Sequence, residues 1–233
     1  MKIKAHIPNA ITLINLFCGC IALIFIARKD FEMTFLFVSL GIFFDFFDGF
    51  FARKFNVSGP LGVQLDSLAD MVTSGVIPGF VMFQLINATE KSTPLLPYFG
   101  FLITLGACYR LANFNIDTRQ SDSFIGLPTP ANTLFIISLP FVKTAFDFQF
   151  FSNLLSNQWI FIGITLLSVY IMNAEIPLFS LKIKDFSVKK YALQLSFLMI
   201  SIIMITFLRI VAVPAIILIY ILISVVNNQK NKL

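Results

Sequence analysis

The sequence is poor in charged residues and in side chains that bind transition metals. Only 12% of its 233 residues are charged, against about 25% in a soluble domain, so the composition excludes an ordinary soluble globule. A single histidine argues against a zinc or haem site built on histidines. Three cysteines, an odd number, do not make a disulfide-stapled secreted module. With 58% hydrophobic residues and 29 phenylalanines, intrinsic disorder is excluded as well.

Long apolar stretches fill most of the chain. A membrane-spanning helix needs about 20 mostly apolar residues, and the sequence offers about eight stretches on that scale. We therefore expect an all-α fold, a polytopic transmembrane helical bundle that forms a single domain over residues 1–233. The last two stretches are nearly continuous, and we divide them at Arg209, shortly before Pro214. The expected spans begin near Pro8, Met33, Asp66, Leu96, Thr129, Asn153, Tyr191 and Arg209.

The distribution of positive charge predicts how the bundle lies in the membrane. Eight spans place both termini on one side, where 12 of the 17 Lys and Arg residues then fall. Because cytoplasmic loops are rich in Lys and Arg, we expect both termini to be cytoplasmic. We also expect the basic segment 182–190 to lie against lipid headgroups. The first stretch has no small-residue cleavage site, so we interpret it as an uncleaved span rather than a signal peptide.

Four aspartates fall within 26 positions, in or beside the second and third expected spans. Asp45 and Asp48 are three residues apart, and Asp66 and Asp70 are four apart, so each pair shares one helix face. The segment 56–60 predicts a turn, which makes the two helices antiparallel neighbours. Since a carboxylate within a bilayer is costly, we expect the two acidic faces to meet in a cavity.

Converging carboxylates repel one another unless cations neutralise them, and Arg53 alone does not balance four negative charges. Ligands that are all oxygen favour hard divalent ions, so we expect two Mg²⁺ or Mn²⁺ ions, which also bind substrate phosphates. Arg53 suits a phosphate oxygen, while Gly49 and Gly62 allow a close approach of substrate or helix. A cation-coupled transporter is an alternative, although the inverted repeat typical of transporters is not visible.

The acidic stretch resembles the signature of the CDP-alcohol phosphatidyltransferase family, D-x2-D-G-x2-A-R-x8-G-x3-D-x3-D. The resemblance implies that the first three aspartates bind a two-metal centre, that the fourth is both a ligand and the general base, and that Gly49 and Arg53 contact the CDP-lipid. Ser58 or Gly59 stands where relatives often use Thr or Ser for the nucleotide phosphate. The resemblance also implies a homodimer. The fixed positions are filled by Asp45, Asp48, Gly49, Ala52, Arg53, Gly62, Asp66 and Asp70.

Further segments extend the resemblance over residues 8–132, while residues 133–233 are expected to add only transmembrane helices. Asn9 and Thr12, followed on the same side by Asn15, resemble the nucleotide-contacting first helix of the family. The segments 110–115 and 124–131 resemble a pair found in bacterial phosphatidylserine synthases, except that Asn113 stands where relatives usually carry Lys or Arg.

The resemblance to this branch implies phosphatidyl transfer from CDP-diacylglycerol to L-serine, with release of CMP, at the cytoplasmic face of a bacterial inner membrane. Arginine binds carboxylates through two parallel hydrogen bonds, so we assign Arg110 to the serine carboxylate. Asn115 and Gly126 are expected to shape the acceptor pocket. Glycerol 3-phosphate, inositol phosphate and choline remain alternative acceptors, because the signature does not choose among them. We expect no nucleic-acid partner.

Overall fold

Helices dominate the computed structural model, which describes residues 2–57, 59–89, 93–117, 124–145, 156–178 and 192–230. The all-α prediction is therefore confirmed, with the addition of one short antiparallel strand pair, β1 (Phe124–Ile125) with β2 (Pro177–Leu178). Within the described ranges the helices form seven continuous segments. These segments are α1 (Lys2–Ala27), α2 (Phe31–Phe55), α3–η1–α4 (Pro60–Asp70, Met71–Val76, Ile77–Asn87), η2–α5 (Leu96–Phe101, Leu102–Ile116), α6 (Thr129–Ala145), α8 (Gln158–Asn173) and α9–η3–α10 (Ala192–Leu208, Arg209–Val211, Ala212–Lys230).

The prediction of about eight spans is wrong in its number. Among the described residues, four helical segments are long and apolar enough to cross a bilayer: His6–Ala27, Phe31–Phe55, Pro60–Asn87 and Leu193–Asn227. The helices α6 and α8 have 17 and 16 residues. At about 1.5 Å per residue they reach only ~25 Å, against a hydrocarbon core of about 30 Å. The expected starts at Asn153 and Tyr191 lie outside the described residues.

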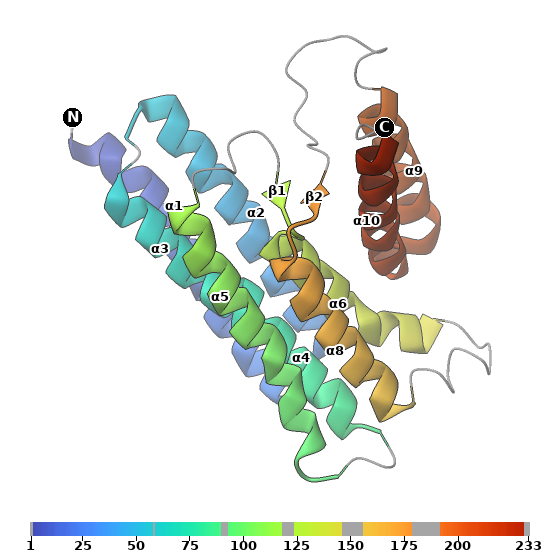
Figure 1. Cartoon of the computed structure of the whole chain (residues 1–233). Coiled ribbons are helices and arrows are strands. Elements are labelled where there is room, and N and C mark those ends of the chain that lie inside the picture. The colour runs from blue at the N-terminus through green and yellow to red at the C-terminus, as the bar shows by residue number, and fades with distance from the viewer. Residues whose placement is uncertain are drawn as a thin grey trace.

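At Arg209, where we divide the last two expected spans, the structure has a bend within one continuous helical segment. Arg209 has a left-handed φ of 52°, and the 3-10 turn η3 that it begins joins α9 directly to α10. No loop separates the two helices, so the last two expected spans are one continuous segment. Its two arms contact each other, and α10 also packs against α6 at one side of the molecule (Figure 1).

The turn between the acidic helices forms where the sequence predicts it. Asn56 ends α2 in the left-handed conformation (φ 54°), and its backbone N–H contacts the carbonyls of Ala52 and Arg53. Gly59 is extended and Pro60 opens α3, a position that proline favours because it lacks an N–H. Consequently α3 begins before Asp66 rather than at it, and Asp66 lies inside the helix.

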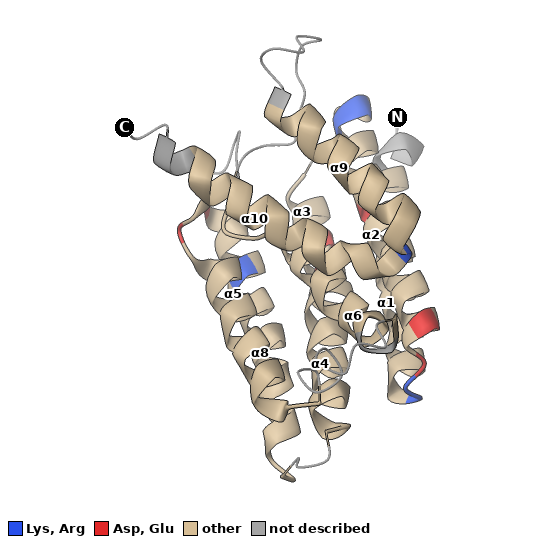
Figure 2. Ribbon diagram, turned by 90° about the vertical axis from the view of Figure 1, so that its right-hand side faces the viewer, with Lys and Arg blue, Asp and Glu red and all other residues tan. Residues whose placement is uncertain are grey.

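The first helices form a bundle in which α1 contacts both α2 and α3, and α5 contacts α3 and α8 (Figure 1). Long stretches of the ribbon, including α4 and α8, carry no charged residue (Figure 2). The core lies between α4, α5, α6 and α8, and its fully buried members include Ile77, Met82, Ile103, Ile136 and Phe161. This apolar core leaves the polar side chains to gather at the other end of α1, α2 and α3.

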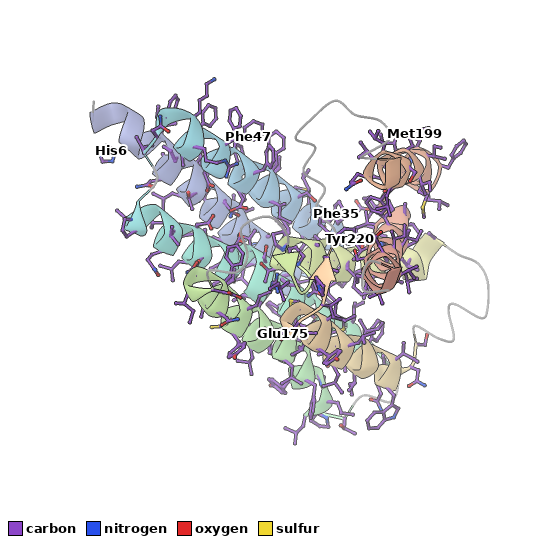
Figure 3. The ribbon with its side chains drawn as sticks, turned by 45° about the horizontal axis from the view of Figure 1, so that its top comes forward. His6, Phe35, Phe47, Glu175, Met199 and Tyr220 are labelled. Carbon is purple, nitrogen blue, oxygen red and sulfur yellow. The ribbon has the colours of Figure 1, made fainter. Side chains whose placement is uncertain are left out.

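Apolar side chains also cover the outer surface. A row of phenylalanines projects from α2, with Phe47 in its middle (Figure 3). Phe46 is 67% exposed and Phe207 on α9 is 82% exposed. Large apolar side chains in such numbers on a surface are typical of contact with lipid.

Candidate active site

The two acidic helix faces meet, as their spacing predicts. Asp45 and Asp48 come from α2, and Asp66 comes from α3. Each offers a carboxylate oxygen, and these three oxygens all lie within 4.8 Å of one another. Such a group of oxygen ligands fits a hard divalent cation, which would also neutralise the repulsion among the carboxylates. The chain's own donor set therefore fits Mg²⁺ or Mn²⁺.

Asp70 lies one turn beyond this group of three and is 7% exposed. It is linked to the others through α1, because Asn15 Nδ2 donates to Asp70 Oδ1 at 3.2 Å and to Asp45 Oδ1 at 3.3 Å. A second residue of α1, Thr12, donates from Oγ1 to Asp48 Oδ2 at 2.6 Å. The helix α1 thus supplies hydrogen bonds to three of the four aspartates.

A cavity of about 200 Å³, here called the first cavity, opens on one side of the aspartates. Six of the seven residues predicted to bind the CDP-lipid line this cavity, together with Asp48 and Asp66. The seventh, Ser58, lies outside the described residues. The six are Asn9, Thr12, Gly49, Arg53, Gly59 and Gly62.

A larger cavity of about 390 Å³, here called the second cavity, borders the same group of aspartates. All four aspartates line it, as do Arg110 on α5 and the segment 128–130 at the start of α6. Four wall residues are common to both cavities: Asp48, Gly49, Arg53 and Asp66. The two cavities therefore adjoin at the acidic group, with Asp48 and Asp66 bordering both.

Arg110 borders the second cavity and also supports its wall through hydrogen bonds. It is 8% exposed, and its guanidinium donates to the carbonyls of Ile125 (2.9 Å), Gly126 (3.2 Å) and Met172. These bonds tie α5 to β1 and to the end of α8. Arg110 therefore fixes the loop before α6 while it borders the second cavity.

The other two residues predicted to contact the acceptor lie behind the walls of the second cavity. Gly126 has φ +73°, and a Cβ there would lie 2.5 Å from the Met172 carbonyl, so only glycine allows this close contact. Asn115 donates from Nδ2 to Ser67 Oγ at 2.8 Å, and Ser67 lines the second cavity next to Asp66. Both residues thus adjoin the pocket through a neighbour.

Several residues of the site were missed by reasoning from the sequence. Asn15 was grouped with the nucleotide contacts, yet its amide meets the aspartates. Thr73 donates to Asn15, and its position three residues after Asp70 was a usable signal. Ser67 lies between two assigned residues in the sequence, and its small polar side chain gave no signal by itself.

A model of the CDP-alcohol phosphatidyltransferase family matches residues 5–171, well over half of the chain. The chain belongs to this family. The matched range includes every residue that lines the first and second cavities. It extends beyond residue 132, where the recognisable motifs end, and closes within α8.

Individual members of the CDP-alcohol phosphatidyltransferase family are also similar to the chain. The CDP-diacylglycerol–serine O-phosphatidyltransferase of Bacillus subtilis is 36% identical over 140 residues, which cover 58% of this chain and 76% of that protein. The enzyme of the same name from Helicobacter pylori is 32% identical, and the alignment covers 60% of each chain. The archaetidylserine synthase of Methanothermobacter thermautotrophicus is 27% identical, over 70% of this chain and 66% of that protein.

Proposed function

We propose that this protein transfers the phosphatidyl group of CDP-diacylglycerol to L-serine, giving phosphatidylserine and CMP. The observation that carries the proposal is that the aspartate group borders two adjoining cavities, because the reaction needs room for a diphosphate and an alcohol at one phosphorus atom. The names of the relatives favour serine over the other acceptors of the family. Archaetidylserine synthase is named for the same serine headgroup on a different lipid.

The first cavity is proposed to hold the CDP end of the lipid substrate. Asn9 and Thr12 border it from α1, and Arg53 supplies a guanidinium that binds phosphate oxygens well. Asp45, Asp48, Asp66 and Asp70 would hold two divalent ions, Mg²⁺ or Mn²⁺. Bound there, such ions stabilise negative charge on the phosphoryl group and the leaving CMP.

The second cavity is proposed to hold serine. Arg110 borders this space and offers N–H groups to the serine carboxylate, while Ser67 and the segment 128–130 complete the wall. Asp70 would accept the proton of the serine hydroxyl as the oxygen attacks phosphorus. A positioned base of this kind contributes about 10²–10⁴-fold to the rate.

The membrane setting follows from the substrate. Diacylglycerol tails remain in the bilayer, and the four candidate spans and exposed apolar side chains provide the matching surface. We propose an integral membrane protein of one domain, whose active site faces the cytoplasm of a bacterial cell. We also propose that two copies associate, as the family resemblance implies.

The decisive experiment is CMP release by the purified protein in detergent micelles that contain CDP-diacylglycerol and Mg²⁺ or Mn²⁺. We expect release with L-serine, and little with glycerol 3-phosphate, inositol phosphate or choline. CMP release with one of those alcohols, and not with serine, would show that the protein has the acceptor of another branch of the family. No acceptor-dependent release at all, in protein that is folded and loaded with either ion, would overturn the enzymatic proposal.

A further inference from the structure

Asn15 lies where α1 approaches the acidic ends of α2 and α3, and it has no solvent exposure. Its amide nitrogen carries two hydrogens, and these reach two acceptors, Asp45 Oδ1 and Asp70 Oδ1. Its amide oxygen lies 2.8 Å from Thr73 Oγ1, whose single hydrogen can be donated to Asn15 Oδ1 or to the Ala69 carbonyl, also at 2.8 Å. One side chain therefore joins both acidic helices to a threonine that belongs to neither cavity wall.

By donating to Asn15 Oδ1, the hydroxyl of Thr73 sets which way the Asn15 amide faces. With the amide oxygen bonded to Thr73, the NH₂ group points toward Asp45 and Asp70. The opposite orientation would place the oxygen against two carboxylates, where no proton is available for a hydrogen bond. A buried polar group without a partner costs about 1–3 kcal/mol, so the threonine hydroxyl holds the amide in the productive orientation.

The backbone around Thr73 is built for this contact. Thr73 lies in the π-helical turn η1, which follows Asp70 directly, and turns of this kind are common at functional sites. On the facing helix α2, Gly41 leaves the space that the pair occupies. A Cβ at Gly41 would lie 2.8 Å from Asn15 Oδ1 and 2.8 Å from Thr73 Cγ2.

We propose that Asn15 and Thr73 are positioning residues that hold Asp45 and Asp70 in the orientation that binds divalent cations, with Thr73 acting through Asn15. The proposal rests on the metal-binding role assigned above to the aspartates, and it is independent of which alcohol the protein uses. Neither residue lines the first or the second cavity. Hydrogen-bond partners of metal ligands typically contribute 10–100-fold to metal affinity or activity, which sets the expected size of the effect.

The test measures Mn²⁺ binding to the purified protein without substrate, from the electron paramagnetic resonance signal of free Mn²⁺. Thr73→Val removes the hydroxyl and keeps the volume, so we expect Mn²⁺ affinity to fall about 10-fold or more. Thr73→Ser restores the hydroxyl and should bind within about threefold of the wild type, a small effect on the scale of such partners.

The matched control is Thr133→Val. Thr133 is also fully buried, and like Thr73 its hydroxyl lies near the carbonyl four residues earlier, here Thr129, and near one further acceptor, here the carbonyl of Ser74 in η1. It makes no bond to Asn15 or to an aspartate among the contacts of the described residues. Thermal unfolding in detergent shows whether each variant is folded. A loss of Mn²⁺ affinity equal in Thr73→Val and Thr133→Val would assign a structural role only and overturn the proposal.

A double-mutant comparison tests whether Thr73 acts through Asn15. We expect Asn15→Ala to weaken Mn²⁺ binding. The double variant Asn15→Ala, Thr73→Val should bind Mn²⁺ as well as Asn15→Ala alone, because the amide through which Thr73 acts is already absent. Additive losses would show that the two residues act separately. If the wild type binds no Mn²⁺ in an aspartate-dependent way, the proposed function fails. If it does bind and Thr73→Val binds equally well, only the positioning proposal fails.

Discussion

Asp66 and Asp70 stand one turn apart on α3 and yet have different surroundings. Asp66 belongs to the close group of three carboxylates and borders both cavities. Asp70 lies outside that group, accepts a hydrogen bond from Asn15, and borders only the second cavity. The two residues are therefore suited to different tasks: Asp66 to the centre of the proposed cation group, and Asp70 to its edge, where a ligand can also meet the attacking alcohol.

Two amide substitutions separate these tasks. We expect Asp66→Asn to lose both divalent-cation binding and turnover, because it removes a charge from the centre of the group. Asp70→Asn should lose about 10²–10⁴-fold in turnover with little change in affinity for CDP-diacylglycerol, since it removes the proton acceptor. Mn²⁺ binding, CDP-diacylglycerol binding and turnover are measured on both variants. Equal turnover in Asp70→Asn and the wild type would remove the base assignment.

Arg110 combines a proposed contact with serine and a defined structural task. Replacing it with alanine leaves the carbonyls of Ile125, Gly126 and Met172 without this donor. We expect Arg110→Ala to raise the KM for serine about tenfold or more, which corresponds to ~1.4 kcal/mol or more. The KM for CDP-diacylglycerol, measured in the same protein, should change less.

The KM for serine of Arg110→Ala distinguishes the proposed serine contact of Arg110 from its structural task. An unchanged KM for serine would leave Arg110 with the structural task alone. Arg110→Lys keeps the charge but not the planar fork of N–H groups, so it should restore little of the serine affinity. A lower unfolding temperature in both variants would report the loss of the bonds to the loop before α6.

At the scale of elements, α1, α2 and η1 approach one another closely enough that a single methyl group matters. We expect Gly41→Ala to displace Asn15 and Thr73, because the added Cβ would lie 2.8 Å from each of them. Overpacking of this kind costs about 1–3 kcal/mol. Mn²⁺ affinity and unfolding temperature should both fall. Gly163→Ala on α8 is the matched control, since nothing lies within 4 Å of its added Cβ. A Gly41→Ala protein with wild-type Mn²⁺ binding would contradict the packing described here.

The sequence predicted the features that depend only on residues close together in the chain. The turn at 56–60 and the shared faces of the aspartates follow from glycine, proline and helical spacing, and both are present. The π-turn η1 was not predictable, because it depends on how α1, α5 and α6 pack around it. The bond from Thr73 to Asn15 joins residues 58 positions apart, which no local pattern reveals. The number of spans was overestimated because apolar composition does not fix where a helix begins and ends.

At the scale of the whole molecule, the orientation in the membrane remains a prediction. The four candidate spans of the described residues are an even number, which keeps both ends of the chain on one side, and because positively charged residues favour the cytoplasmic side we expect both ends to lie there. A green fluorescent protein fused after residue 233 should therefore fluoresce in bacterial cells, and alkaline phosphatase at the same position should be inactive. Fusions after residue 29, in the turn between α1 and α2, serve as the opposite control and should give active phosphatase. Active phosphatase at the C-terminal fusion would place that end outside.

The wall shared by the two cavities bears on the order of events during turnover. Since Asp48, Gly49, Arg53 and Asp66 face both spaces, the nucleotide and the alcohol can be present together. A ternary complex of this kind favours direct displacement, with inverted stereochemistry at phosphorus, over a lipid-modified protein intermediate. Labelled CMP should then fail to exchange into CDP-diacylglycerol while the alcohol is withheld.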